Sequence, residues 1–339
     1  MLGYLKYAAA GLAAATLVSG QTYSECNPMK KTCPANVGTT ESRHTFDFTK
    51  SSGLDQWTTT AGNVKTSPNG AEFTVNKQGD APTIRTDFHI FFGEVSVTMK
   101  SAPGTGIVSS IVLQSDDLDE IDWEAVGGDT THVQTNYFGK GDTTTYDRAT
   151  FESVSAPQEV FHTYKVVWTK DATTWSVDGK VLRTLTSNDA QSGTRYPQTP
   201  MNVRIGIWAG GDPTNAEGTI QWAGGLTDYS KTPYTMYIKD VTIVNYNPAE
   251  SYTWSDQSGS AESIKFTGST NSTSSTVSKP SVAGSLITAA STARPSSSSS
   301  VSRPSAPTSS PAFNAASNLS AGSLGFVSVL AVASGFLFL

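Results

Sequence analysis

Apolar and polar residues alternate with a period of two through much of the chain between residues 42 and 252. In one such run Val95, Val97 and Met99 are separated by polar side chains, which is the pattern of a half-buried strand. The pattern shows no amphipathic helical stretch of any length. Four further runs have the character of strands, at residues 106–113, 164–169, 203–208 and 234–246.

The turns between these runs contain Gly, Pro, Asn and Asp. Asp178-Gly179 separates two short apolar runs by two residues, and this pair tolerates the positive φ angles that a type I′ hairpin turn demands. Many short strands with such turns indicate a β-sandwich or barrel, and no internal repeat suggests a propeller. We therefore expect an all-β, concanavalin-like jelly roll sandwich of two antiparallel sheets, with a concave substrate cleft, over residues 21–255.

The composition changes at the N-terminus. Residues 1–6 include Lys6, residues 7–18 are mainly apolar, and Gly20 is a small residue near which a signal peptidase could cleave. We interpret residues 1–20 as a signal peptide. The alternative is an N-terminal membrane anchor, which needs a longer apolar run.

Beyond the expected domain, residues 256–314 consist largely of Ser, Thr, Pro and Ala, which bury too little apolar surface to offset the entropy of ordering. We expect a glycosylated stalk, with Asn271 as an N-glycan acceptor, or a plain low-complexity linker. Residues 315–339 end in an apolar run, and Asn314 starts a group of three small residues. This favours a glycosylphosphatidylinositol (GPI) anchor attached at Asn314, with residues 315–339 removed; a tail-anchored protein is the alternative.

These features predict an extracellular protein, held at the plasma membrane by a lipid anchor only and within reach of an extracellular matrix. In that oxidising compartment the two cysteines, Cys26 and Cys33, are expected to form a local disulfide. We expect no metal, because the four histidines have no metal-ligand spacing among themselves: His44, His89, His132 and His162. No cofactor is expected either.

The formal net charge is -6, and the chain has no run of Lys and Arg. Nucleic-acid binding takes most of its affinity from basic side chains that neutralise phosphates, so a nucleic-acid partner is not expected. A neutral polymer is a better match for this surface. We expect a monomer.

The most informative segment is residues 119–124, Asp-Glu-Ile-Asp-Trp-Glu. In a strand, Glu120, Asp122 and Glu124 share one face, while the two apolar residues between them enter the core. Acids in a row repel one another and raise at least one pKa. Glycoside cleavage with retention uses such a group, because it needs an ionised carboxylate as nucleophile and a protonated carboxyl as acid. A solvated acidic face, or a calcium site that also uses the nearby Asp116 and Asp117, are the alternatives.

Residues 120–124 match the E-x-D-x-E signature of glycoside hydrolase family 16, and the chain resembles the fungal Crh group within it. The resemblance extends over roughly residues 22 to 250 and is carried by residues 26–28, 32–34, 119–124, 134–137, 139–142 and 208–212. It implies that Glu120 is the nucleophile, Glu124 the acid/base and Asp122 the assisting carboxylate, in agreement with the strand argument.

Substrate-binding residues are expected on neighbouring strands. Gln134 and Asn136 share a face on the strand after the catalytic one, and Arg204 shares a face with Trp208, an aromatic plate on which a sugar could stack. Thr219 is included mainly on the resemblance. For three other tryptophans we expect positions in the core: Trp168, Trp175 and Trp222.

The resemblance implies a retaining transglycosylase that cleaves chitin and transfers it, through a covalent glycosyl-enzyme, to a β-glucan acceptor, cross-linking the fungal cell wall. The alternatives are an endo-β-1,3(4)-glucanase or chitin hydrolase of the same fold and, in another class, a noncatalytic wall lectin or structural mannoprotein. The last two would need neither Glu120 nor Glu124.

Overall fold

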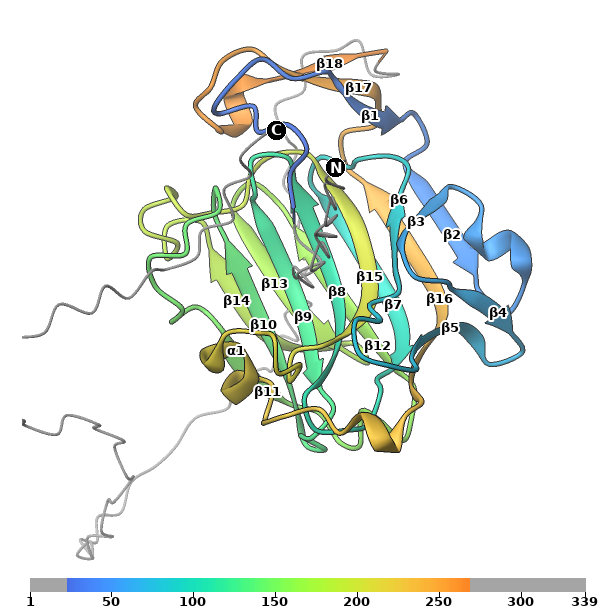
Figure 1. Ribbon diagram of the computed structural model, residues 1–339. Helices are drawn as coiled ribbons and strands as arrows, with labels where there is room; N and C mark the ends of the chain where they lie inside the picture. The colour runs from blue at the N-terminus through green and yellow to red at the C-terminus, as the bar shows by residue number, and fades with distance from the viewer. Residues whose placement is uncertain (1–22, 269–339) are drawn as a thin grey trace, which may run out of the picture. The chain divides into compact units, whose positions relative to one another are not determined.

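The computed structural model describes residues 23–268, which form a β-sandwich (Figure 1). One layer is a seven-stranded antiparallel sheet in the order β11-β10-β9-β8-β15-β6-β3. Its strands are β3 (Trp57–Ala61), β6 (Thr83–Thr86), β8 (Ile107–Ser115), β9 (Glu120–Val126), β10 (His132–Phe138), β11 (Thr150–Ser153) and β15 (Met201–Ala209).

The second layer has the order β14-β13-β12-β7-β16-β5-β4, and β2 also pairs with β16. Its strands are β2 (Arg43–Asp47), β4 (Lys65–Ser67), β5 (Gly70–Val75), β7 (Gly93–Lys100), β12 (His162–Trp168), β13 (Ala172–Val177), β14 (Lys180–Thr186) and β16 (Tyr234–Asn245). A third, small sheet has the order β1-β17-β18, from β1 (Asn36–Thr39), β17 (Ala249–Trp254) and β18 (Ile264–Thr267).

Helical structure is minor in the described residues. One short helix, α1 (Glu217–Trp222), and three 3-10 turns, η1 (Ser51–Leu54), η2 (Tyr229–Lys231) and η3 (Ala261–Ser263), lie in connections between strands. None of the helices in this part of the chain is long and apolar enough to cross a membrane. The expected all-β architecture is confirmed.

Alternation along the strands builds the core. In β7 every second side chain from Gly93 is buried, as the Val95, Val97 and Met99 pattern predicted. The turn at Asp178-Gly179 has φ angles of 51° and 81°, so both residues adopt the left-handed conformation that this hairpin requires. Trp168 and Trp175 are fully buried between the sheets, as expected.

The expected start of the stalk at residue 256 is wrong. Residues up to 267 belong to the folded body, because β18 pairs with β17 and its Ile264 is only 4% exposed. The Phe266 ring lies 5.6 Å from Phe91 and 5.8 Å from Tyr252, measured between ring centroids. The Ser, Thr, Pro and Ala composition of residues 256–314 suggested a stalk or linker, but tertiary contacts order residues 256–267. The other predictions for the termini, residues 1–20, Asn271, Asn314 and residues 315–339, lie outside the described residues.

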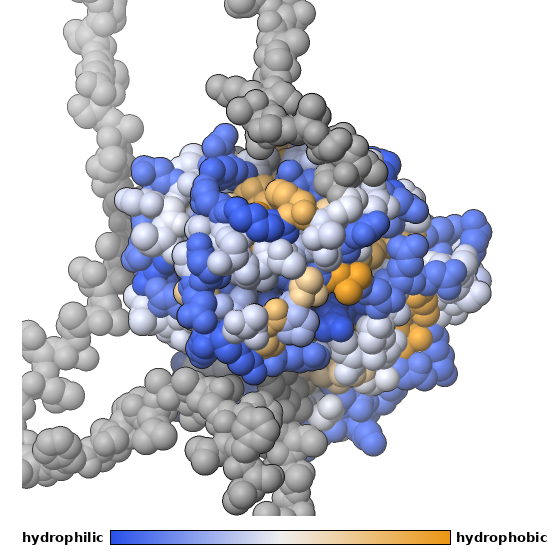
Figure 2. Space-filling view, turned by 90° about the horizontal axis from the view of Figure 1, so that it is seen from above, coloured by the Kyte–Doolittle hydropathy of each residue, from blue (hydrophilic) through white to orange (hydrophobic). Residues whose placement is uncertain are grey.

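The end of the molecule that carries the small sheet is seen in Figure 2. Its surface is mainly hydrophilic, and hydrophobic residues form only small patches. Among the described residues, Val37 of β1 and Phe266 of β18 are large hydrophobic side chains with substantial exposure.

A chain that ends at residue 255 is therefore expected to be less stable than one that ends at residue 268. Loss of β18 removes the buried Ile264 side chain and uncovers Tyr252, a cost of about 3 kcal/mol by analogy with core truncations. For a domain of this size that corresponds to a fall in Tm of roughly 6 to 12 °C. Thermal unfolding of both chains measures it. Equal Tm values would show that residues 256–268 are a passive linker.

Candidate active site

Strand β9 presents three acidic side chains on one face of the seven-stranded sheet. Glu120, Asp122 and Glu124 alternate with Ile121 and Trp123, which are 0% and 1% exposed and belong to the core. The Trp123 ring packs edge-on against Tyr164, with 5.4 Å between ring centroids. The core residues therefore fix the direction in which the three acids point, as predicted.

Neighbouring strands place polar side chains beside each acid. Glu120 is in register with Gln114 of β8, and Gln114 Nε2 donates to Glu120 Oε2 at 3.4 Å. On the other side β10 places Asn136 opposite Asp122, and Gln134 opposite Glu124. The two amides predicted on the following strand thus do lie beside the carboxylates.

Asp122, the middle acid, is almost completely buried, at 2% exposure. Burial raises its pKa well above the usual value, and the charges of Glu120 and Glu124 and a hydrogen bond with Glu120 add to the shift. A protonated Asp122 can donate that hydrogen bond to an ionised Glu120. Its backbone carbonyl accepts from the Trp175 indole nitrogen at 3.1 Å, which ties the middle of β9 to the core.

Glu124 is held in its acid form. Burial first, and then the charge of Glu120, raise the pKa of Glu124 to about 8. At neutral pH the row therefore has a protonated acid at Glu124, next to Asp122, whose pKa is also raised. This division of protonation states between similar carboxyls is the one that acid catalysis next to a carboxylate nucleophile requires.

A pocket of about 530 Å³ opens at the Glu124 end of this row. Gln134 Oε1 faces it and accepts a hydrogen bond from Trp222 Nε1 at 2.9 Å. The Trp222 ring stacks on Trp208, with 6.0 Å between centroids and 24° between planes. Other residues that line the pocket include Asp129, His132 and Phe151.

The structure corrects two predictions for tryptophans. Trp222, expected in the core, is half-buried and lines the pocket beside Glu124. Trp208, expected as the exposed sugar plate, is 9% exposed and packs in a small cluster with Val108 and Ala223. The reason is α1, which follows the Gly-Gly loop and folds Trp222 over Trp208. Trp208 thus lies beneath Trp222, and Trp222 lines the pocket.

Three other residues predicted to bind substrate have surroundings that the sequence did not indicate. Arg204 is 3% exposed, and its guanidinium lies 4.6 Å from the Tyr23 ring centroid and donates to the Tyr23 carbonyl at 3.3 Å. It lines a second pocket, of about 250 Å³. Asn136 uses its Oδ1 to accept from the Tyr137 amide. Thr219 lies on α1, outside the residues that line the pocket.

The N-terminal segment lies against the Glu120 end of the row. Its predicted disulfide between Cys26 and Cys33 is present. The Tyr23 amide donates to Gln114 Oε1 at 3.1 Å, so Gln114 connects this segment to Glu120. The sequence did not indicate Gln114, because its role depends on the register of β8 with β9. Among the described residues no group of His, Cys, Asp and Glu has the arrangement of a metal site.

The model of the glycosyl hydrolases family 16 matches residues 53–224, the segment that contains the acidic row and the pocket. The chain belongs to glycosyl hydrolase family 16. Among relatives of this family-16 chain is Crh-like protein 5 of Aspergillus fumigatus, 68% identical over 273 residues that cover 80% of this chain and 69% of the relative. Crh-like protein 1 of the same fungus is 60% identical over 76% of this chain and 70% of the relative.

Solved structures agree with this membership of family 16. Crh5 transglycosylase in complex with NAG is 69% identical, with a TM-score of 0.70, and the match covers 71% of this chain and all of that chain. A Bacillus licheniformis β-glucanase is 24% identical with a TM-score of 0.51, over 61% of this chain and 99% of that chain, and this likeness shows the fold alone. The family-16 chain is an enzyme of the glycosidase and transglycosylase class.

The protonation of Glu124 can be tested without substrate. Since the charge of Glu120 contributes to the raised pKa, Glu120→Gln is expected to lower the pKa of Glu124 from about 8. Carbon-13 NMR titration of the Glu side-chain carboxyls measures it. Glu72→Gln, on the other sheet, is the matched control and should leave the titration in place. An unchanged Glu124 in Glu120→Gln would contradict the coupling.

Proposed function

We propose that this chain is a retaining transglycosylase that cleaves chitin and transfers the cleaved chain to β-glucan in the fungal cell wall. The observation that carries the proposal is the row on β9, in which burial and neighbouring charges raise the pKa of Asp122 and hold Glu124 in its acid form beside Glu120. Its similarity to Crh5 transglycosylase, a structure solved with NAG, supports both the reaction class and a substrate built of N-acetylglucosamine.

In the first step Glu124 donates its proton to the glycosidic oxygen that leaves. Glu120 attacks the anomeric carbon, so the bond from that carbon to the leaving oxygen breaks while a bond to a Glu120 oxygen forms. Asp122 donates a hydrogen bond to Glu120 and keeps the nucleophile oriented. The energy of the broken bond is retained in the glycosyl-enzyme, and the step requires no cofactor.

In the second step Glu124 acts as base. It removes the proton from a hydroxyl of the acceptor glucan, the hydroxyl oxygen bonds to the anomeric carbon, and the Glu120 carboxylate is released. Two inversions at the same carbon give retention. Water in place of the sugar hydroxyl would give hydrolysis, the reaction of the glucanase or chitin hydrolase alternative.

The pocket beside Glu124 suits an acceptor sugar. A leaving or incoming chain must lie on the side of the acid/base, and on that side the Trp222 plate and the exposed Phe151 ring provide apolar surface. Gln134 provides an amide for hydroxyl groups. An acceptor that stacks there displaces water from Glu124, which favours transfer over hydrolysis.

For the setting of the enzyme we propose an extracellular monomer, held by a GPI anchor at the plasma membrane or in the wall, with chitin and β-glucan as partners. The Cys26–Cys33 disulfide supports an oxidising compartment. The signal peptide, the N-glycan at Asn271 and the anchor at Asn314 remain proposals from the sequence. A noncatalytic lectin is not favoured, because it would not need the acidic row.

Incubation of residues 23–268 with chitin oligosaccharides and fluorescently labelled laminarin oligosaccharides tests the function. Longer labelled products are expected, and Glu120→Gln and Glu124→Gln should each lower their rate of formation by at least about a thousandfold, since each removes a covalent or proton-transfer group. Chromatography follows the label. Shortening of the label alone would make the enzyme a hydrolase, and unchanged activity in both variants would reject the proposed residues.

The pH dependence follows from the protonation of Glu124. The first step needs the proton of Glu124, whose pKa is raised to about 8. We therefore expect kcat/KM to fall above about pH 8, by about a factor of ten for each pH unit. Initial rates across pH 5 to 10 measure it. A fall that begins near pH 5 would show that Glu124 is not the acid.

A further inference from the structure

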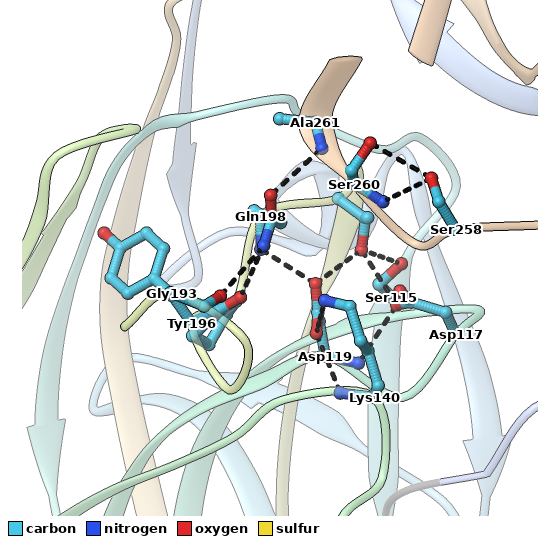
Figure 3. Close-up of polar contacts among 12 residues, drawn as sticks. Ser115, Asp117, Asp119, Lys140, Gly193, Tyr196, Gln198, Ser258, Ser260 and Ala261 are labelled. Atoms are coloured by element: carbon cyan, nitrogen blue, oxygen red, sulfur yellow. Dashed lines mark hydrogen bonds and ion pairs between the residues drawn. The ribbon is translucent and has the colours of Figure 1, made fainter. Parts of the chain in front are cut away.

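Immediately before Glu120, Asp119 is completely buried and accepts hydrogen bonds on both carboxylate oxygens. Oδ1 accepts from the backbone amide of Lys140 at 2.9 Å, and Oδ2 accepts from that of Gln198 at 2.8 Å. Lys140 follows β10, and Gln198 precedes β15. One carboxylate thus joins the start of β9 to loops from two other parts of the chain, as Figure 3 shows.

A second acid lies in the same cluster. Asp117 is also completely buried, and its Oδ1 accepts from the Asp119 amide at 3.1 Å. The Thr199 hydroxyl oxygen lies 2.8 Å from Asp117 Oδ1 and 2.9 Å from Asp119 Oδ2. A hydroxyl has one hydrogen, so it can donate to only one of the two acids. The other contact is attractive only if that carboxyl is protonated and donates to Thr199.

The charges of Asp117, Asp119 and Lys140 balance if one of the two acids keeps its proton. Lys140 Nζ lies 3.5 Å from Asp119 Oδ1, so two acids face one buried ammonium group. Burial and the charge of Asp119 raise the pKa of Asp117 to about 7. With a proton on Asp117 the cluster is neutral. The Tyr196 phenol is a further titratable group near the cluster. Its pKa is raised mainly by burial and, to a smaller extent, by the charge of Asp119.

The C-terminal segment closes this cluster. Gln198 Oε1 accepts from the Ala261 amide at 3.1 Å, next to the Ser258–Ser260 turn in Figure 3. A Cβ added at Gly259, which has a φ of 67°, would lie 3.0 Å from Asp117 Oδ2 and 3.0 Å from the Lys140 side chain. The turn therefore lies directly on the acids and excludes water from them.

We propose that Asp119 is a positioning residue for Glu120, fixed by a buried cluster in which Asp117 holds a proton. Asp119 does not contact substrate. It fixes the position of the next residue, the nucleophile Glu120, which is the first residue of β9. An error of about 1 Å in such a position can lower a rate about a hundredfold. The inference rests on the proposed function, because it takes Glu120 as the nucleophile.

Two isosteric variants separate the roles. Asp119→Asn has only one oxygen for two amide donors, so its own NH2 must face one of them and the start of β9 must shift. In Asp117→Asn the oxygen can still accept from the Asp119 amide, while the NH2 takes the place of Oδ2, which has no hydrogen-bond partner. Asp117→Asn is thus uncharged, like the protonated acid, and keeps the acceptor for the Asp119 amide, so it is the matched control.

Kinetics should split accordingly. Asp119→Asn is expected to lower kcat in the laminarin transfer assay 10- to 100-fold with KM changed less than about threefold, while Asp117→Asn at pH 5 keeps kcat within about twofold. Far-ultraviolet circular dichroism and the Tm of each variant exclude simple unfolding. If Asp119→Asn had the kcat of the wild type while Glu120→Gln had no transfer activity, the positioning role would be overturned and the proposed function would stand.

A second measurement needs no substrate. Since the charge of Glu120 contributes to the raised pKa of Glu124, displacement of Glu120 is expected to move the carbon-13 titration of Glu124 in Asp119→Asn but not in Asp117→Asn. This result can support or reject the positioning role even if the proposed function fails. An identical Glu124 titration in all three proteins would reject it.

The proton on Asp117 has its own test. A carboxyl whose folded pKa is about 7, against an ordinary 3.8, loses its contribution to stability as pH rises from about 4 to 7. The Tm advantage of Asp117→Asn over the wild type should therefore grow across this window and then level off. A constant difference between pH 4 and 8 would show that Asp117 holds no proton in this range.

Discussion

The active site depends on a row of three carboxyl groups on one strand face, of which the middle one is almost completely removed from water. Asp122 is almost fully buried between two glutamates, and a charge there would face both burial and repulsion. The strand can hold such a row only because its other face, Ile121 and Trp123, is locked into the core and because the Trp175 indole binds the Asp122 carbonyl. Packing between the sheets is thus what makes the protonation pattern possible.

Much of this arrangement follows from local sequence rules. Alternation predicts strands, and spacing of two predicts that Glu120, Asp122 and Glu124 share a face, because both depend only on the geometry of one extended segment. The same rule placed Gln134 and Asn136 on one face of the next strand. The antiparallel register then brought them beside the acids, as expected for strands joined by a short connection.

Features that depend on distant contacts were not predicted from the sequence. Tryptophan is usually a core residue in a β-sandwich. Trp222 lines a pocket instead, because α1 places its ring against Trp208. Residues 256–268 have the composition of the stalk that follows them, yet Gly259 packs against Asp117 and Ile264 enters the core. Single residues order such a segment, so average composition is a poor guide at a domain boundary.

The stacked pair of Trp208 and Trp222 gives the cleft an optical property of its own. Two indole rings 6.0 Å apart and inclined by 24° couple their electronic transitions, and this coupling contributes to the circular dichroism of the protein. The tryptophans at positions 123, 168 and 175 are buried in the core, away from any ligand in the cleft. A sugar that contacts Trp222 therefore changes the circular dichroism spectrum of the unlabelled protein, while the contribution of the core tryptophans stays the same.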